Sequence, residues 1–215
     1  MKLLLTSAGL PNKAIRSKFL QMMGKNPKDI SVAFIPTAAD PEEDKRFVKS
    51  AMDEIKEIGM QLFTVDLKEE NEQSLRRKLS DCDVVYVNGG NTFYLLDWAR
   101  KSGFDKVIID LVGQGKVYIG TSAGSLLVGP DISVSGWMPS WDRNIVGLKD
   151  ISGLGIVPFV VSPHFVESDR QVLEKNMKDV SYPIIALTDK QAVIVFDDEQ
   201  ELIGEGDPIA LHGSN

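Results

Sequence analysis

The sequence contains little cysteine, little histidine and no excess of positive charge. Cys82 is the single cysteine, so the chain can form no internal disulfide and no cysteine-based zinc site, and we expect a reducing, cytoplasmic setting. The net charge is −7, with aspartate and glutamate spread along the chain. Because no basic patch is evident, we expect no nucleic-acid partner.

Long apolar runs are also absent. No stretch approaches the length that spans a bilayer, so we expect no membrane partner. The apolar run at residues 3–5 is too short for a secretion signal, and we interpret it as the first buried strand. With 215 residues, of which 43% are apolar and 26% charged, the sequence is typical of one globular domain, predicted to cover residues 1–215.

Short apolar segments alternate with amphipathic segments along most of the chain. Helices are predicted at residues 41–58, 92–101, 104–112 and 169–180. Strands are predicted at residues 2–6, 31–35, 61–66, 83–88, 116–119, 156–162, 183–187 and 192–196. The alternation predicts an α/β fold with a mainly parallel sheet flanked by helices. After about residue 183 only short turns separate the strands, which predicts a C-terminal antiparallel meander.

The most informative motif is Gly120-Thr121-Ser122-Ala123-Gly124, which joins a predicted strand to the start of a helix. A tight strand-to-helix turn with glycines around its serine lifts the hydroxyl out of the sheet edge, as in serine hydrolases. Ligands of such sheets bind at the carboxyl ends of the strands, where this turn lies. We therefore predict that Ser122 is a nucleophile.

A second glycine-containing loop, Asn88-Gly89-Gly90-Asn91-Thr92, follows another predicted strand and precedes a helix. Its backbone amides are candidates for an oxyanion hole beside Ser122. The loop lacks the glycine spacings typical of phosphate-binding motifs, and a simple helix cap by Asn91 or Thr92 is compatible with this role.

A serine nucleophile requires a base, and the chain contains two histidines, His164 and His212. His212 lies near the C-terminus in a polar tail. His164 follows an apolar strand, which predicts that it lies on the same sheet edge as Ser122. His164 is therefore the candidate general base.

Four segments together resemble the peptidase E family of serine dipeptidases. The likeness spans most of the chain and rests on Phe34-Ile35-Pro36, Asn88-Gly89-Gly90-Asn91-Thr92-Phe93, Gly120-Thr121-Ser122-Ala123-Gly124 and Ser162-Pro163-His164-Phe165. The resemblance implies a fold similar to class I glutamine amidotransferases and cleavage of dipeptides that begin with aspartate. It also implies catalysis by Ser122 and His164, and an oxyanion hole formed by the amides of Gly90 and Ala123.

The resemblance also points to substrate-binding residues. The segment Asp169-Arg170-Gln171 resembles the family segment whose arginine pairs with the aspartyl side chain of the substrate. A guanidinium group suits a carboxylate, so we expect Arg170 to select acidic substrates and Asn91 to contribute to substrate binding. An arginine at the start of a surface helix can equally be solvated.

The third catalytic position departs from the family pattern. The family has an acidic residue before a Met-Pro pair, whereas Trp137 precedes Met138-Pro139 here. An indole can only donate a hydrogen bond and cannot stabilise an imidazolium as a carboxylate does. Two alternatives stay open: Trp137 steadies a Ser-His dyad, or an acid from another position, Asp142 or Asp131, supplies the charge.

These observations favour a cytoplasmic serine peptidase that cleaves Asp-X dipeptides through an acyl-enzyme. We expect a small peptide substrate, no cofactor and no metal, and the sequence is compatible with a homodimer. One alternative is a non-catalytic member of the fold that binds a small amino-acid-like ligand. Another is a hydrolase of a different aspartyl bond, such as the cyanophycin-type linkage.

Overall fold

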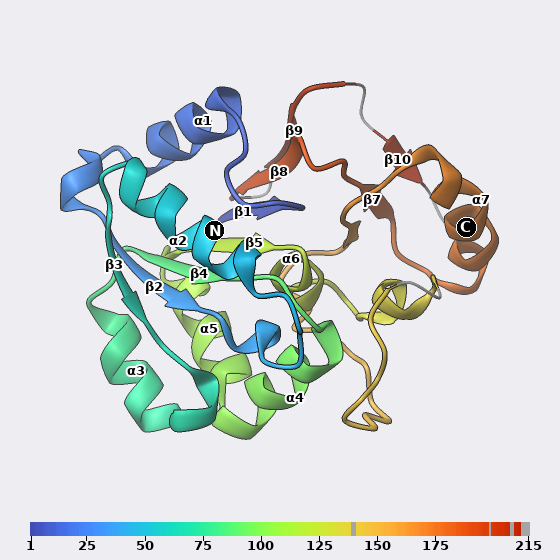
Figure 1. Ribbon diagram of the computed structural model, residues 1–215, viewed down its shortest axis with the longest axis horizontal. Coiled ribbons are helices and arrows are strands. Elements are labelled where there is room, and N and C mark those ends of the chain that lie inside the picture. The colour runs from blue at the N-terminus through green and yellow to red at the C-terminus, as the bar shows by residue number, and fades with distance from the viewer. Residues whose placement is uncertain (139–140, 198, 207–208, 212–215) are drawn as a thin grey trace.

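Five neighbouring parallel strands form most of the main sheet (Figure 1). The computed structural model describes residues 1–138, 141–197, 199–206 and 209–211. The sheet has seven strands in the order β3-β2-β4-β5-β1-β8-β9, of which β8 and β9 are antiparallel to their neighbours. The strands are β1 (Lys2–Thr6), β2 (Ser31–Ile35), β3 (Gln61–Thr64), β4 (Val84–Val87), β5 (Val117–Thr121), β8 (Gln191–Phe196) and β9 (Glu199–Gly204). The predicted mainly parallel sheet is confirmed.

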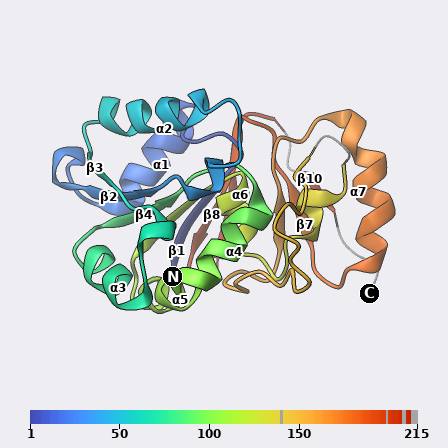
Figure 2. The ribbon, with the colours of Figure 1, turned by 60° about the horizontal axis from the view of Figure 1, so that its bottom comes forward.

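A second, three-stranded sheet lies beside the first (Figure 2). It contains β6 (Val160–Ser162), β7 (Ile184–Ala186) and β10 (Ile209–Leu211); β6 and β7 run parallel, and β10 runs antiparallel to β7. Antiparallel strands are therefore present at the C-terminal end as predicted. They are divided between the two sheets, because β8 and β9 extend the main sheet whereas β10 joins the second.

Helices cover both faces of the main sheet (Figure 2). Helices α1 (Lys13–Met23) and α2 (Arg46–Glu57) pack on one face. The other face is covered by α3 (Glu72–Ser80), α4 (Thr92–Ser102) and α5 (Phe104–Gly113). The central strands are buried on both faces, which explains their nearly unbroken apolar sequences.

Two short helices lie near the second sheet. Helix α6 (Ala123–Leu127) follows β5, and α7 (Arg170–Asn176) packs with the second sheet around Val160, Leu173 and Ile184. Helix α7 is shorter than predicted because a 3-10 turn replaces its last part, and α2 begins later than predicted. Within the described part of the chain, no helix has the length and apolar character needed to cross a membrane.

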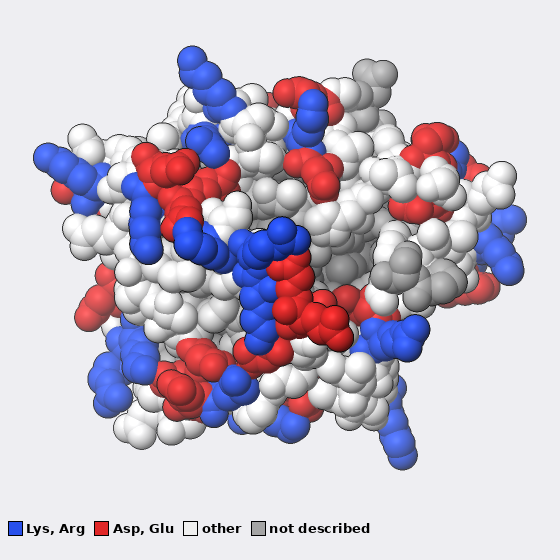
Figure 3. All heavy atoms as spheres, in the orientation of Figure 1, with Lys and Arg blue, Asp and Glu red and all other residues white. Residues whose placement is uncertain are grey.

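The carboxyl ends of strands from both sheets meet in one region. The segments that follow β1, β4 and β5 of the main sheet lie there together with those that follow β6 and β7. On the face drawn in Figure 3, lysine and arginine side chains are interspersed with aspartate and glutamate.

Candidate active site

Ser122 lies at a strained turn between β5 and α6. Its φ of 52° and ψ of −110° are unusual for a residue with a side chain, and such strain is often found at functional sites. The turn is held because the Ser122 amide donates a hydrogen bond to the Thr6 carbonyl at 2.9 Å. A Cβ at Gly124 would lie 2.2 Å from the Val87 carbonyl oxygen, so only glycine fits at that position.

Buried hydroxyl groups brace the turn from behind. The Ser125 hydroxyl accepts a hydrogen bond from the Thr6 amide at 3.0 Å and lies 2.7 Å from the Gly120 carbonyl, to which it can donate. Tyr118 donates from its hydroxyl to the Gly124 carbonyl at 2.6 Å. Burial raises the pKa of Tyr118, so it remains a donor at neutral pH. These bonds fix the backbone from which Ser122 projects.

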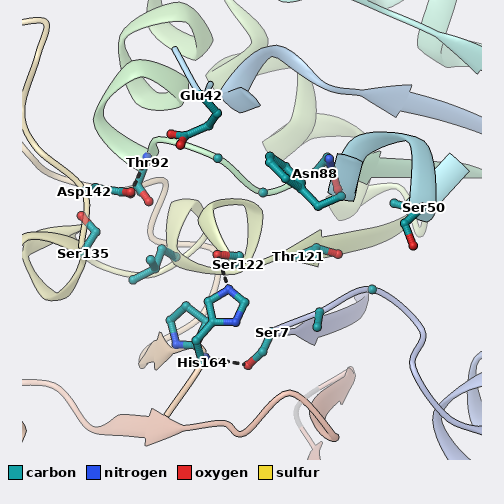
Figure 4. Close-up of a pocket in the computed structure, with 18 of the residues that line it drawn as sticks. Ser7, Glu42, Ser50, Asn88, Thr92, Thr121, Ser122, Ser135, Asp142 and His164 are labelled. Carbon is teal, nitrogen blue, oxygen red and sulfur yellow. Dashed lines mark hydrogen bonds between the residues drawn. The ribbon is translucent and has the colours of Figure 1, made fainter. Parts of the chain in front are cut away.

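The imidazole of His164 contacts the Ser122 hydroxyl (Figure 4). The distance from Nε2 to Oγ is 3.0 Å, within hydrogen-bond range. His164 has a φ of 57°, and its backbone amide donates a hydrogen bond to the Ser7 hydroxyl at 3.1 Å. The structure thus brings together the two residues that the sequence analysis paired, Ser122 from the end of β5 and His164 from just beyond β6.

Asp189 occupies the other side of the imidazole. Its Oδ1 lies 2.6 Å from Nδ1 of His164, and this hydrogen bond lowers the pKa of the Asp189 carboxyl. A carboxylate at Nδ1 holds the proton on that nitrogen and leaves Nε2 free to accept the serine proton. The side chains of His164 and Asp189 are 49% and 63% exposed, so solvent weakens the interaction between them.

The sequence does not single out Asp189, because Asp189-Lys190 is typical of a turn between two strands. The residues after β7 emerge at the same sheet edge as His164 because β7 runs parallel to β6, and the sequence alone does not specify this pairing. The hydroxyl of Ser7 donates a hydrogen bond to the Leu187 carbonyl at 2.9 Å and accepts one from the His164 amide. It thereby links the loop after β6 and the loop after β7 to the end of β1.

The three residues considered for the third position lie elsewhere. Trp137 is half-buried and packs against the apolar cluster of the second sheet. Asp142 accepts a hydrogen bond from the Thr92 amide at 2.7 Å and reaches His164 only through a longer-range electrostatic interaction. Asp131 accepts from the Ser133 amide. The expectation for Trp137, Asp142 or Asp131 is therefore corrected, because Asp189 is the residue that bonds to Nδ1 of His164. Pro139 and His212 lie outside the described residues.

The amides of Gly90 and Ala123 flank the serine turn. Neither donates a hydrogen bond to another residue that the structure describes. Gly90 has a φ of 134°, and a Cβ there would lie 2.2 Å from the Ala38 carbonyl oxygen. The neighbouring Gly89 is close enough to Ser122 that an added Cβ would lie 3.1 Å from the serine Cβ. The two loops are therefore adjacent, as an oxyanion hole requires.

Asn91 and Arg170, the expected substrate-binding residues, have other partners. The Asn91 amide group caps α4 by accepting from the Tyr94 amide at 2.9 Å, and donates to the Arg143 carbonyl at 3.0 Å. Arg170 pairs with Glu167 and stacks over Phe165. Neither Asn91 nor Arg170 is among the described residues that line the cavity.

A cavity of about 700 Å³ opens beside Ser122 and His164. It includes three acids, Glu42, Glu54 and Asp142, and no lysine or arginine among its described lining residues. Burial raises the pKa of Asp142; burial and the neighbouring Asp142 together raise the pKa of Glu42. No motif in the sequence predicts a role for Glu42, Ser7 or Trp141, all of which line the cavity.

The arrangement is suited to nucleophilic catalysis. Ser122 can transfer its proton to Nε2 of His164, Asp189 can stabilise the imidazolium that results, and the free amides can face a developing oxyanion. Over the residues that the structure describes, no group of three or more His, Cys, Asp or Glu side chains is placed to hold a metal ion.

The chain is similar to known peptidases over most of its length. The model of peptidase family S51 matches residues 3–203. An uncharacterized peptidase of Pasteurella multocida is 32% identical over 182 residues, which cover 82% of this chain and 86% of the relative. Peptidase E of Shewanella denitrificans is 26% identical over 206 residues, covering 91% of this chain and 83% of that protein.

A solved structure agrees with this relationship. A Listeria monocytogenes protein described as a candidate peptidase E superimposes with a TM-score of 0.81 at 27% identity, covering 95% of this chain and 98% of that one. The resemblance to peptidase E noted in the sequence is thereby confirmed. On the family match, the relatives and this fold, the chain belongs to peptidase family S51 and is a serine-type peptidase.

Proposed function

We propose that this peptidase hydrolyses short peptides through an acyl-enzyme, with Ser122 as nucleophile, His164 as general base and Asp189 as the supporting carboxylate. The observation that carries the proposal is the continuous hydrogen-bonded line from Ser122 Oγ to His164 Nε2 and from His164 Nδ1 to Asp189 Oδ1. The three residues come from loops after β5, β6 and β7.

The proposed reaction has two halves. Ser122 Oγ attacks the peptide carbonyl as His164 Nε2 takes its proton, and the oxyanion lies between the amides of Gly90 and Ala123. His164 then donates this proton to the departing amine. In the second half a water molecule, deprotonated by His164, hydrolyses the serine ester and restores the free hydroxyl. Throughout, Asp189 keeps the second proton of the imidazole on Nδ1.

The size of the cavity supports a small substrate. About 700 Å³ lies within the range of small-molecule sites and suits a peptide of a few residues. Cleavage of Asp-X dipeptides, with Arg170 as the partner of the aspartyl group, is the narrower candidate implied by the family resemblance. The engagement of Arg170 with Glu167 and its position outside the described lining weigh against that role.

Amine release from a panel of dipeptides tests the function. The panel carries aspartate, alanine, leucine or lysine as the first residue and compares the wild type with Ser122→Ala and with Asp29→Asn. Asp29 is exposed and lies just before β2, at the amino end of the sheet and away from the site. We expect wild type and Asp29→Asn to cleave members of the panel and Ser122→Ala to cleave none. Equal rates for wild type and Ser122→Ala would refute the mechanism.

We also propose a cytoplasmic location. Cys82 is a free, buried thiol, which fits a reducing compartment. Fractionation of cells that produce the protein tests this, with recovery from the cytoplasmic fraction as the expected result and recovery from the culture medium as the contradicting one.

A further inference from the structure

One wall of the cavity carries two acidic side chains without a cationic partner. Among the described residues, neither Glu42 nor Asp142 forms a salt bridge; Lys45 acts on Glu42 only at longer range. The third acid, Glu54, differs because it forms a salt bridge with Arg16 at 2.7 Å and accepts a hydrogen bond from the Leu10 amide. Glu42 and Asp142 therefore leave negative charge on this wall that a ligand can neutralise.

Buried polar groups of the same cavity also lack partners. The Thr92 hydroxyl, in a residue that is 1% exposed, interacts with the Asp142 carboxylate and so acts to lower its pKa, but the geometry falls short of a regular hydrogen bond. The Asn88 side-chain amide nitrogen, also in a residue 1% exposed, has no acceptor within the described chain. Buried polar groups are normally paired, so both point to a polar ligand in the cavity. Figure 4 shows Glu42, Thr92 and Asp142 on the same side of the cavity.

This wall is close to the candidate oxyanion hole. Asp142 accepts a hydrogen bond from the backbone amide of Thr92, and Thr92 is two residues along the chain from Gly90. Two residues span at most about 7 Å, so the carboxylate lies near the position of the scissile carbonyl. In a peptide cleaved after its first residue, the α-ammonium is separated from that carbonyl by one carbon atom. This separation is compatible with an ammonium group at the wall while the carbonyl lies at the oxyanion hole.

We propose that Glu42, Asp142 and the Thr92 hydroxyl bind the protonated α-amine of the substrate, so that the enzyme removes a neutral or basic first residue and disfavours aspartate. This rests on the proposed peptidase function of the same cavity. Three acceptors match the three N–H donors of an ammonium group. An aspartyl side chain in the cavity would meet acids and no lysine or arginine among the described lining residues, and would be repelled.

The raised pKa values of the two acids agree with this role. Burial and repulsion by Asp142 raise the pKa of Glu42, and burial raises that of Asp142, because the longer-range effects of Lys45 on Glu42 and of His164 on Asp142 are smaller than the cost of burial. A bound ammonium group supplies a nearer cation.

The test compares kcat/KM for Ala-Ala, N-acetyl-Ala-Ala, Lys-Ala and Asp-Ala. We expect the wild type to prefer Ala-Ala over its acetylated form by at least about 100-fold, and Ala-Ala and Lys-Ala over Asp-Ala by at least about tenfold, in line with the loss of a charge-paired contact. In each of the variants Asp142→Asn and Glu42→Gln, the ratio of kcat/KM for Ala-Ala to kcat/KM for N-acetyl-Ala-Ala should fall at least about tenfold. The fall should come mainly from a higher KM for Ala-Ala.

Glu43→Gln is the matched control, since Glu43 is exposed, adjacent to Glu42 and absent from the lining. It should retain the wild-type ratios. The inference is overturned if acetylation has no effect, if neither cavity variant changes the ratio while both remain folded, or if the wild type prefers Asp-Ala. Absence of cleavage of every substrate by the wild type would instead refute the proposed function, so the two failures are distinguishable.

Discussion

Replacement of Asp189 by asparagine is the sharpest mutational test of the site. Oδ1 of Asp189 lies 2.6 Å from Nδ1 of His164, so the carboxylate stabilises the imidazolium that forms as Ser122 loses its proton. Asparagine keeps the size of the side chain but removes the charge. Its amide group can also donate to Nδ1, which favours the tautomer whose Nε2 is protonated and cannot accept the serine proton.

The size of the effect follows from the exposure of the pair. Unit charges about 4 Å apart interact by about 1 kcal/mol in water and by about 4 kcal/mol near a protein surface. At 1.36 kcal/mol per factor of ten, this corresponds to a loss of about fivefold to 10³-fold in kcat. The tautomer change adds to the electrostatic loss, so we expect kcat to fall by about 10² to 10³. The loss should be smaller than the roughly 10⁴ seen for a buried triad carboxylate, because Asp189 is 63% exposed.

The assay is steady-state release of amine from the best dipeptide of the panel, with thermal unfolding to verify that each variant is folded. Asp29→Asn is the control for a surface aspartate and should leave kcat unchanged. Trp137→Phe separates the two accounts of the third position, since Trp137 packs against the second sheet and should tolerate phenylalanine with less than about a threefold change in kcat. A folded Asp189→Asn enzyme with near wild-type kcat, or a crippled Trp137→Phe enzyme, would refute the assignment.

Three further predictions concern the surroundings of the triad. Gly90→Ala should lower kcat by about 10² to 10³, the usual loss for a displaced oxyanion donor, because the added Cβ would clash with the Ala38 carbonyl. Steady-state kinetics on the folded variant check this prediction, and an unchanged kcat would contradict it. Arg170→Ala should change kcat/KM for Asp-Ala and Ala-Ala by the same factor, and a loss confined to Asp-Ala would show that Arg170 selects aspartate. Asp142→Asn should raise the melting temperature near pH 7, because burial raises the pKa of Asp142 and ionisation therefore opposes folding as pH rises. This gain should shrink below about pH 4, the ordinary range of an aspartate pKa, and a gain that is independent of pH would contradict the electrostatic explanation.

The sequence predicted the central sheet because its signal is local. Strands such as β4 (Val84–Val87) are fully buried, and their unbroken apolar runs are visible without tertiary information. Helices α1 and α3 were missed, although Asn12 and Asn71 cap their first turns. The second sheet was not predicted, because the partners of a three-residue strand such as β6 depend on long-range pairing that a short apolar segment does not specify.

The candidate site shows the same contrast between residues with a local sequence signal and residues placed by long-range pairing. Ser122 and His164 were identified because a glycine-flanked turn and an isolated histidine after a strand are local features. Asp189 was not, because an aspartate between two strands is also a common turn residue, and its function depends on the pairing of β7 with β6. The acidic wall of Glu42 and Asp142 was equally invisible, since these residues are far apart in sequence and meet only around the cavity.

Covalent labelling with a fluorophosphonate tests the central claim most directly, because the reagent phosphonylates serine hydroxyls that a neighbouring base activates. Intact-mass analysis of the labelled wild type is predicted to show one phosphonyl group per chain, and peptide mapping should locate it on Ser122. The label should be absent in Ser122→Ala and should form much more slowly in His164→Gln, which lacks the base 3.0 Å from the hydroxyl. Labelling of a different residue, or an unlabelled wild-type enzyme that still cleaves dipeptides, would contradict the account.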